Sequence, residues 1–150
     1  NFNIIYFILN IKQWVELLYN KNKRIMIIDD DKDITNLFKI FLECNDYNVD
    51  AYTSPIDGIQ NFRRNSYDLI ILDIKMPKMD GMTLYRKIKE IDDTVIVCLT
   101  TADKNYIQEL QKDILDVEKT VIYKPILLKD LKIRIESLLI DEESKSLITN

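Results

Sequence analysis

Short apolar runs alternate with longer amphipathic segments along most of the chain. An apolar run of about four to eight residues fits a strand covered on both faces, as the strands of parallel sheets are. Amphipathic segments fit helices that pack on such a sheet. The sequence therefore predicts a doubly wound α/β sandwich with right-handed crossovers. Its strands are expected at residues 24–31, 47–52, 69–74, 94–99 and 120–123, and its helices begin near residues 31–33, 54, 80, 103 and 127.

The chain has 150 residues, which suits one domain of ordinary size and leaves no room for a second full one. We divide it into an apolar N-terminal extension at 1–22, an α/β domain at 23–140 and a polar tail at 141–150. The fourth helix of the domain is expected at 103–115 and the fifth at 127–140. The tail is expected to fray.

The extension is unusually apolar and is predicted to form an extra helix. Lys12, Gln13 and Glu16 interrupt it before it reaches the roughly 20 apolar residues of a membrane span. Two alternatives stay open. The helix could pack on its own domain, or it could offer an apolar surface to a partner helix or to a second copy in a homodimer.

The composition excludes several kinds of chemistry. The chain has no histidine, so it cannot supply a Ser/His/Asp triad, a histidine-ligated zinc or a phosphohistidine of its own. The net charge of -4 and the lack of a basic cluster argue against direct binding of nucleic acid. Cys44 and Cys98 form no CxxC pair, which fits a reducing, cytoplasmic compartment.

Polar side chains follow four of the five predicted strands. Asp29 and Asp30 come after the first, Asp73 after the third, Thr101 after the fourth and Lys124 after the fifth. The carboxyl ends of parallel strands share the edge of the sheet where ligands bind. Neighbouring carboxylates repel one another unless a cation neutralises them, and Mg²⁺ accepts carboxylate and phosphate oxygens. The set therefore predicts a magnesium-assisted phosphoryl site.

Each of these groups has a structural explanation when taken alone. Asp73 could cap the turn after its strand, Lys124 could be a surface lysine, and Thr100 or Thr101 could cap the next helix. Helix capping explains one or two of the aspartates at 29–31 but hardly all three. The joint placement of the groups at one edge favours a functional site.

Four motifs occur in order: IIDDD at 27–31, DIKMPKMDG at 73–81, TA at 101–102 and KP at 124–125. Together they resemble the response-regulator receiver domains, over roughly residues 23–140. The resemblance implies a flavodoxin-like fold with five helices around a five-stranded parallel sheet of order 2-1-3-4-5.

The resemblance also implies a role for each group. Asp73 would be the phosphoacceptor, and Asp29 and Asp30 the acid pair that organises Mg²⁺. Thr101 would be the switch hydroxyl, and Lys124 would contact the phosphate. The backbone carbonyl of Lys75 would join Asp30 and Asp73 as a metal ligand, and the Lys124-Pro125 peptide would be cis.

The phosphoryl group would come from a phosphohistidine on a histidine kinase or histidine phosphotransferase, and the ionised carboxylate would need no general base. Phosphorylation would then bias the face formed by the fourth helix, the fifth strand and the fifth helix, where a downstream protein target would bind. Such a chain is a stand-alone signalling switch rather than an enzyme, because it catalyses only its own phosphoryl transfer and dephosphorylation.

The sequence departs from the family pattern in three places. Val121 stands where many receivers have an aromatic residue, with Tyr123 two positions later on the same face. The segment 113–119 lacks the usual Gly-Ala turn, so the fourth helix is expected to end differently. The aromatic switch is expected to be lost or partly replaced by Tyr123, and coupling to the output face to be weaker or differently routed. Lys75 and Asp103 are opposed charges that could bridge over the site and hinder the hydrolytic water.

Two other functions are compatible with parts of this pattern. One is a pseudo-receiver that serves as a protein-interaction module without phosphorylation, although Asp73, Lys124 and the acid pair are all present. The other is a small enzyme of the haloacid-dehalogenase type, which also forms an aspartyl phosphate. Such an enzyme needs a second acid two residues after the nucleophile, where this chain has Lys75.

Overall fold

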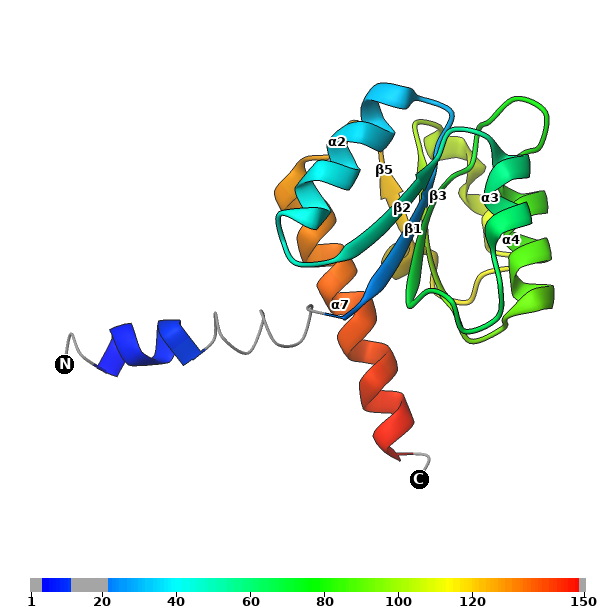
Figure 1. Cartoon of the computed structure of the whole chain (residues 1–150). Helices are drawn as coiled ribbons and strands as arrows, with labels where there is room; N and C mark the ends of the chain where they lie inside the picture. Colours follow the sequence, from blue (N-terminus) through cyan, green and yellow to red (C-terminus); the bar gives the residue numbers. More distant parts are fainter. Residues whose placement is uncertain (1–3, 12–21, 149–150) are drawn as a thin grey trace.

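The computed structural model describes residues 4–11 and 22–148. Its centre is a five-stranded sheet of order β2-β1-β3-β4-β5 in which every neighbouring pair is parallel, as predicted (Figure 1). The strands are β1 (Arg24–Ile28), β2 (Asn48–Tyr52), β3 (Leu69–Asp73), β4 (Ile96–Thr101) and β5 (Val121–Tyr123).

Helices cover both faces of this sheet (Figure 1). On one face, α2 (Lys32–Glu43) and α7 (Leu128–Ile148) pack on the side chains of Ile25, Ile27 and Ile71. On the other, α3 (Pro55–Asn61) and α4 (Gly81–Ile91) pack on a second cluster. All five residues of β3 are buried, which explains why its sequence is apolar up to Asp73.

Three helices begin where the sequence supplies a capping side chain. Asp31 caps α2, Ser54 caps α3 ahead of Pro55, and Asp80 caps α4, each by accepting hydrogen bonds from backbone amides of the first turn. Capping therefore accounts for one of the three clustered aspartates, Asp31.

The prediction of a continuous helix over 103–115 is wrong. The segment contains a 3₁₀ turn, η1 (Lys104–Tyr106), and one helical turn, α5 (Ile107–Leu110). The amides of Asp113 and Ile114 both bond back to the Leu110 carbonyl and end it. A further turn, α6 (Val117–Thr120), then begins at Asp116, whose carboxylate accepts from the Lys119 amide. The predicted fifth strand consequently starts one residue late, at Val121.

The last helix is also longer than predicted. The sequence suggested an end at residue 140 and a frayed tail, whereas α7 continues to Ile148. No glycine or proline interrupts residues 141–148, and ion pairs hold this part of the helix to the domain. Asp141 lies 3.4 Å from Lys119 Nζ, and Glu143 lies 2.8 Å from Lys23 Nζ.

In the N-terminal extension, residues 4–11 are helical, as predicted. Their large apolar side chains are exposed, from 47% for Ile11 to 70% for Tyr6, so this short helix does not pack on the domain. The remaining predictions for the extension concern residues 1–3 and 12–21, which lie outside the described residues. Among the described residues, no helix is both long and apolar enough to cross a membrane.

Candidate functional site

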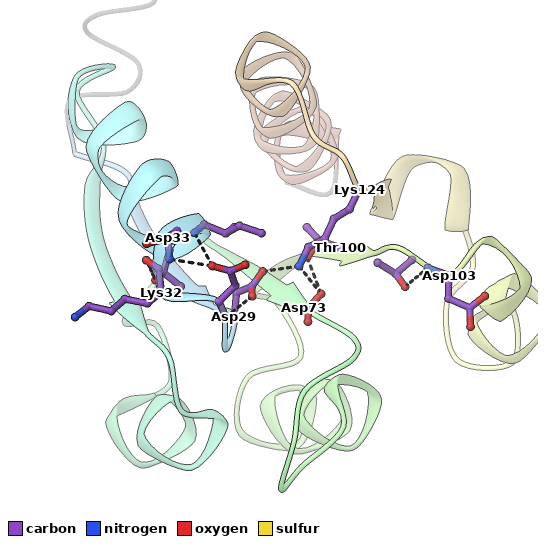
Figure 2. Close-up of polar contacts among 11 residues, drawn as sticks. Asp29, Lys32, Asp33, Asp73, Thr100, Asp103 and Lys124 are labelled. Carbon is purple, nitrogen blue, oxygen red and sulfur yellow. Dashed lines mark hydrogen bonds and ion pairs between the residues drawn. The ribbon is translucent and has the colours of Figure 1, made fainter.

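The carboxyl edge of the sheet brings together the charged groups that the sequence placed at the strand ends. Asp29 follows β1, Asp73 is the last residue of β3, and Lys124 follows β5. Figure 2 shows the lysine side chain reaching between the two carboxylates. Its Nζ lies 2.8 Å from Asp29 Oδ2 and 3.0 Å from Asp73 Oδ1. The Lys124-Pro125 peptide is cis, as the resemblance implied.

Burial and charge oppose each other at Lys124. Burial alone would lower the pKa of this ammonium, but its hydrogen bonds and ion pairs with Asp29 and Asp73 outweigh that cost and raise the pKa. Lys124 is therefore a fixed positive charge between two buried acids, rather than an ordinary surface lysine.

Asp73 is 4% exposed. Burial is the main cause that raises the pKa of its carboxyl group, and the charges of Asp29 and Asp30 act in the same direction. Lys124 opposes the shift without cancelling it. A buried acid with a raised pKa, next to two other acids, is a site that gains from additional positive charge.

The donors suit a hard divalent cation. One carboxylate oxygen from each of Asp29, Asp30 and Asp73 lies within 4.8 Å of the others. Asp29 is buried and anchored by the Asp31 amide, which donates to its Oδ1 at 2.9 Å, while Asp30 is exposed. Three acids face one ammonium, and all the ligand atoms are oxygens, which is the donor set that Mg²⁺ prefers. The residues therefore fit the predicted metal.

The two threonines at the end of β4 make different contacts. Thr101 is buried, and its hydroxyl accepts a hydrogen bond from the Asp103 amide at 3.1 Å, in the turn before η1. It is the neighbouring Thr100 that contacts Asp73, with its hydroxyl 3.4 Å from Oδ1. The register of β3 and β4 pairs Asp73 with Thr100 directly, and no local pattern in the sequence could have given this register.

The loop after Asp73 is held against the site by a close backbone contact. The Gly81 amide donates to the Ile74 carbonyl at 2.8 Å. A Cβ atom on Gly81 would overlap the Asp73 carbonyl oxygen and would lie 2.6 Å from Ile74 Cα. Glycine at this position therefore lets the start of α4 touch the backbone of the acidic residue.

The predicted ion pair between Lys75 and Asp103 is present. Lys75 Nζ lies 3.9 Å from Asp103 Oδ2 and 4.4 Å from the centre of the Tyr106 ring. Both charged side chains are largely exposed, so the bridge itself contributes little stability. It links the loop after β3 to the segment after β4.

Val121 and Tyr123 share the face of the sheet that carries α3 and α4, as strand alternation predicts. Val121 is 3% exposed, and Tyr123 is partly buried, as is Tyr106 on the same face. The aliphatic side chain of Val121 therefore lies beside β4, at the position where the family resemblance implies an aromatic residue.

Comparisons with known proteins agree with this geometry. The model of one family, the response regulator receiver domain, matches residues 25–136. Transcriptional regulatory protein RprY of Bacteroides fragilis is 31% identical over 120 residues, which is 77% of this chain and 49% of that protein. Regulatory protein VanRB of Enterococcus faecalis is 35% identical over 118 residues, 77% of this chain and 52% of that protein. The chain spans about half the length of these curated relatives.

Solved structures show the same fold. A response regulator receiver domain protein from Clostridium thermocellum has a TM-score of 0.68 at 29% identity, and covers 84% of this chain and 98% of its own. A CheY-like receiver domain protein from Methanospirillum hungatei has a TM-score of 0.72 at 27% identity, and covers 82% and 98%. Both likenesses extend over nearly the whole of the solved chains.

Proposed function

The chain belongs to the response regulator receiver domain family, and on this premise we propose that it is a signalling switch whose Asp73 accepts a phosphoryl group. Receiver domains belong to two-component signalling and are not conventional enzymes. The observation that carries the proposal is the Lys124 ammonium held within 3.0 Å of a buried, metal-competent aspartate. A structural ion pair needs only one acid. Here Lys124 contacts both Asp29 and Asp73, and Asp30 lies beside them.

Each residue has a defined task in this reaction. The Asp73 carboxylate attacks the phosphorus of a phosphohistidine on the partner kinase or phosphotransferase, and the nitrogen–phosphorus bond breaks. No general base is required, because the ionised carboxylate is already the nucleophile. The Lys124 ammonium already lies 3.0 Å from Asp73 Oδ1, where its positive charge can stabilise the oxygens of the incoming phosphoryl group.

Asp29, Asp30, Asp73 and the Lys75 carbonyl would hold Mg²⁺. When bound, the ion neutralises charge on the transferred group and helps to orient it. Asp29 has a second task, since it keeps Lys124 at the site in the unphosphorylated protein through a 2.8 Å contact. The Asp31 carboxylate caps α2, and the Asp31 amide anchors Asp29.

The output would run through Thr101 and the adjoining segments. Its hydroxyl now accepts from the Asp103 amide, and reorientation toward a phosphoryl group would release that bond. The segment η1–α5 follows directly, so a downstream protein target is proposed to bind the face of α5, β5 and α7.

The direct test is incubation with acetyl phosphate and intact-mass detection. We expect one phosphoryl adduct that requires magnesium and is lost in Asp73→Asn. Asp33→Asn, which changes an exposed acid of α2, should keep the adduct. An adduct that survives in Asp73→Asn would overturn the assignment, and so would no adduct on the wild-type protein.

A further inference from the structure

The Thr100 side chain approaches the acceptor carboxylate from the neighbouring strand. β3 and β4 are in register at Asp73 and Thr100, so the two side chains project from adjacent backbone positions on the same side. The Thr100 hydroxyl donates to Asp73 Oδ1 over 3.4 Å (Figure 2). Thr100 is 1% exposed and Asp73 is 4% exposed, so water does not compete freely for either group.

Two donors therefore converge on one carboxylate oxygen. Lys124 Nζ is 3.0 Å from Oδ1, but it lies closer to Asp29 Oδ2, at 2.8 Å, and divides its charge between the two acids. Within the described part of the chain, Asp73 Oδ1 is the only side-chain acceptor of the Thr100 hydroxyl. The 3.4 Å separation is long for an O–H···O bond, as befits an oxygen that already accepts a shorter bond from an ammonium.

We propose that Thr100 speeds the loss of the phosphoryl group by stabilising the Asp73 carboxylate as it leaves. This role rests on the proposed function of Asp73. A buried hydroxyl that donates to a carboxylate oxygen stabilises negative charge there, and does so more than it would in water. The effect of the hydroxyl depends on when that charge is present during the reaction.

Hydrolysis of the aspartyl phosphate restores the charge. A water oxygen bonds to phosphorus, the bond between phosphorus and the Asp73 oxygen breaks, and its electron pair stays on the carboxylate. Both hydrogens of the water end on the inorganic phosphate. In the loose transition state of phosphoryl transfer, the leaving oxygen already carries much of this charge. A hydrogen bond from Thr100 thus lowers the barrier to hydrolysis.

Phosphoryl uptake responds differently. The same hydrogen bond stabilises the carboxylate before it attacks, and the charge on the carboxylate decreases as the new bond forms. Removal of the hydroxyl should therefore leave uptake unchanged or slightly faster. A residue needed only to shape the site would slow uptake when replaced, so the two directions of the reaction separate this role from a merely structural one.

The threonine allows closely matched variants. Thr100→Val keeps the branched shape and removes the hydroxyl, and Thr100→Ser keeps the hydroxyl and removes the methyl group. Each protein would be phosphorylated with acetyl phosphate and magnesium, freed of the donor, and followed by intact mass. We expect the lifetime of the adduct in Thr100→Val to be about twofold to tenfold longer, the equivalent of one hydrogen bond. Thr100→Ser should decay within about twofold of the wild-type rate.

An equal or shorter lifetime in Thr100→Val would overturn the proposal, as would slow decay in Thr100→Ser. If Thr100→Val does not fold, Thr100→Ala removes the same hydroxyl and is compared with Thr100→Ser in its place. Normal phosphoryl uptake with an unchanged decay rate in Thr100→Val would reject the role of Thr100 and leave the proposed function of Asp73 intact. Absence of any wild-type adduct rejects the proposed function of Asp73 and this role with it.

A double-mutant cycle in chelator tests the contact without phosphorylation or metal. Urea unfolding is measured for the wild type, Thr100→Val, Asp73→Ala and the double variant. We expect Thr100→Val to lower the unfolding midpoint more in the Asp73 background than in the Asp73→Ala background. Equal shifts in the two backgrounds would show that the hydroxyl does not act on Asp73, and would overturn the proposal whatever the lifetimes.

Discussion

At the scale of single residues, the buried carboxyl group of Asp73 links stability to pH. Its pKa is raised, so the folded protein favours the protonated form more than the unfolded chain does. The resulting contribution to folding is complete below the usual value of 3.8 and is lost as pH rises through the raised pKa.

Asp73→Asn should therefore be more stable than the wild type at neutral pH in metal-free buffer. The advantage should shrink as the pH falls toward 3.8. Thermal unfolding across this range measures it, with Asp93→Asn, an exposed acid, as the control. A less stable Asp73→Asn at neutral pH would show that the pair with Lys124 outweighs the cost of burial.

The exposed ion pair between Lys75 and Asp103 leads to a second prediction at this scale. It joins the loop after β3 to the segment after β4, with the Tyr106 ring beneath the Lys75 ammonium. We propose that it shields the phosphoryl group on Asp73. Replacement of both residues by alanine should shorten the lifetime of the phosphoryl group by about twofold to tenfold, because water reaches phosphorus more easily. Lys104→Ala, an exposed lysine of η1, is the control. An unchanged decay rate would show that the ion pair between Lys75 and Asp103 does not protect the phosphoryl group from water.

At the scale of elements, the contact between α4 and the end of β3 depends on Gly81. A side chain there meets backbone atoms of Asp73 and Ile74, which cannot move aside easily. Gly81→Ala should lower the free energy of unfolding by about 2–3 kcal/mol, a typical cost of overpacking.

Gly58, inside helix α3, provides the matched comparison. A Cβ atom on Gly58 would lie 2.7 Å from the flexible end of the Ile28 side chain rather than against backbone atoms. Gly58→Ala should cost less, since alanine also favours the helix by about 1 kcal/mol. Urea unfolding of the two variants compares them. Similar losses in both would contradict the backbone contact at Gly81.

The elements of the output face support a prediction about coupling. The short turns η1, α5 and α6 lie where one continuous helix was expected, and Val121 lies where the family resemblance implies an aromatic residue. A phosphate mimic should therefore shift amide resonances strongly at Asp73 and Thr101 and only weakly across α5 and β5. Large shifts throughout α5 and β5 would show that coupling to this face is intact.

The sequence predicted elements best where local pattern and tertiary packing agree. The buried runs gave the five strands and the capping residues gave the starts of α2, α3 and α4, because both signals are local. It failed between residues 103 and 120, where Asp116 starts a separate turn, and beyond residue 140, where ion pairs to Lys23 and Lys119 extend the helix. Those contacts join residues far apart in the sequence.

The candidate site was predictable to the same degree. The positions of Asp29, Asp73 and Lys124 followed from strand ends alone, because parallel strands share one edge. The contact of Thr100 with Asp73 depends on strand register, which local pattern does not give. The sheet order likewise came only from the resemblance to a family.

At the scale of the whole molecule, the acidic edge makes stability depend on a divalent ion. If Mg²⁺ binds the folded state and not the unfolded chain, it raises the free energy of unfolding by about 2.7 kcal/mol at a Mg²⁺ concentration of one hundred times its Kd. Thermal unfolding with and without magnesium should show this gain, and Asp30→Asn should reduce it, since Asp30 is an exposed member of the acid cluster. An unaltered gain in Asp30→Asn would place the ion elsewhere.

The central claim is that Asp73 carries the phosphoryl group. Borohydride reduces an aspartyl phosphate to homoserine, so reduction after treatment with acetyl phosphate and magnesium, followed by peptide mapping, marks the acceptor within the sequence. We expect homoserine at position 73, and none when the donor is omitted or when Asp73 is replaced by asparagine. Homoserine at Asp29, Asp30 or any other aspartate, with position 73 unmodified, would contradict it.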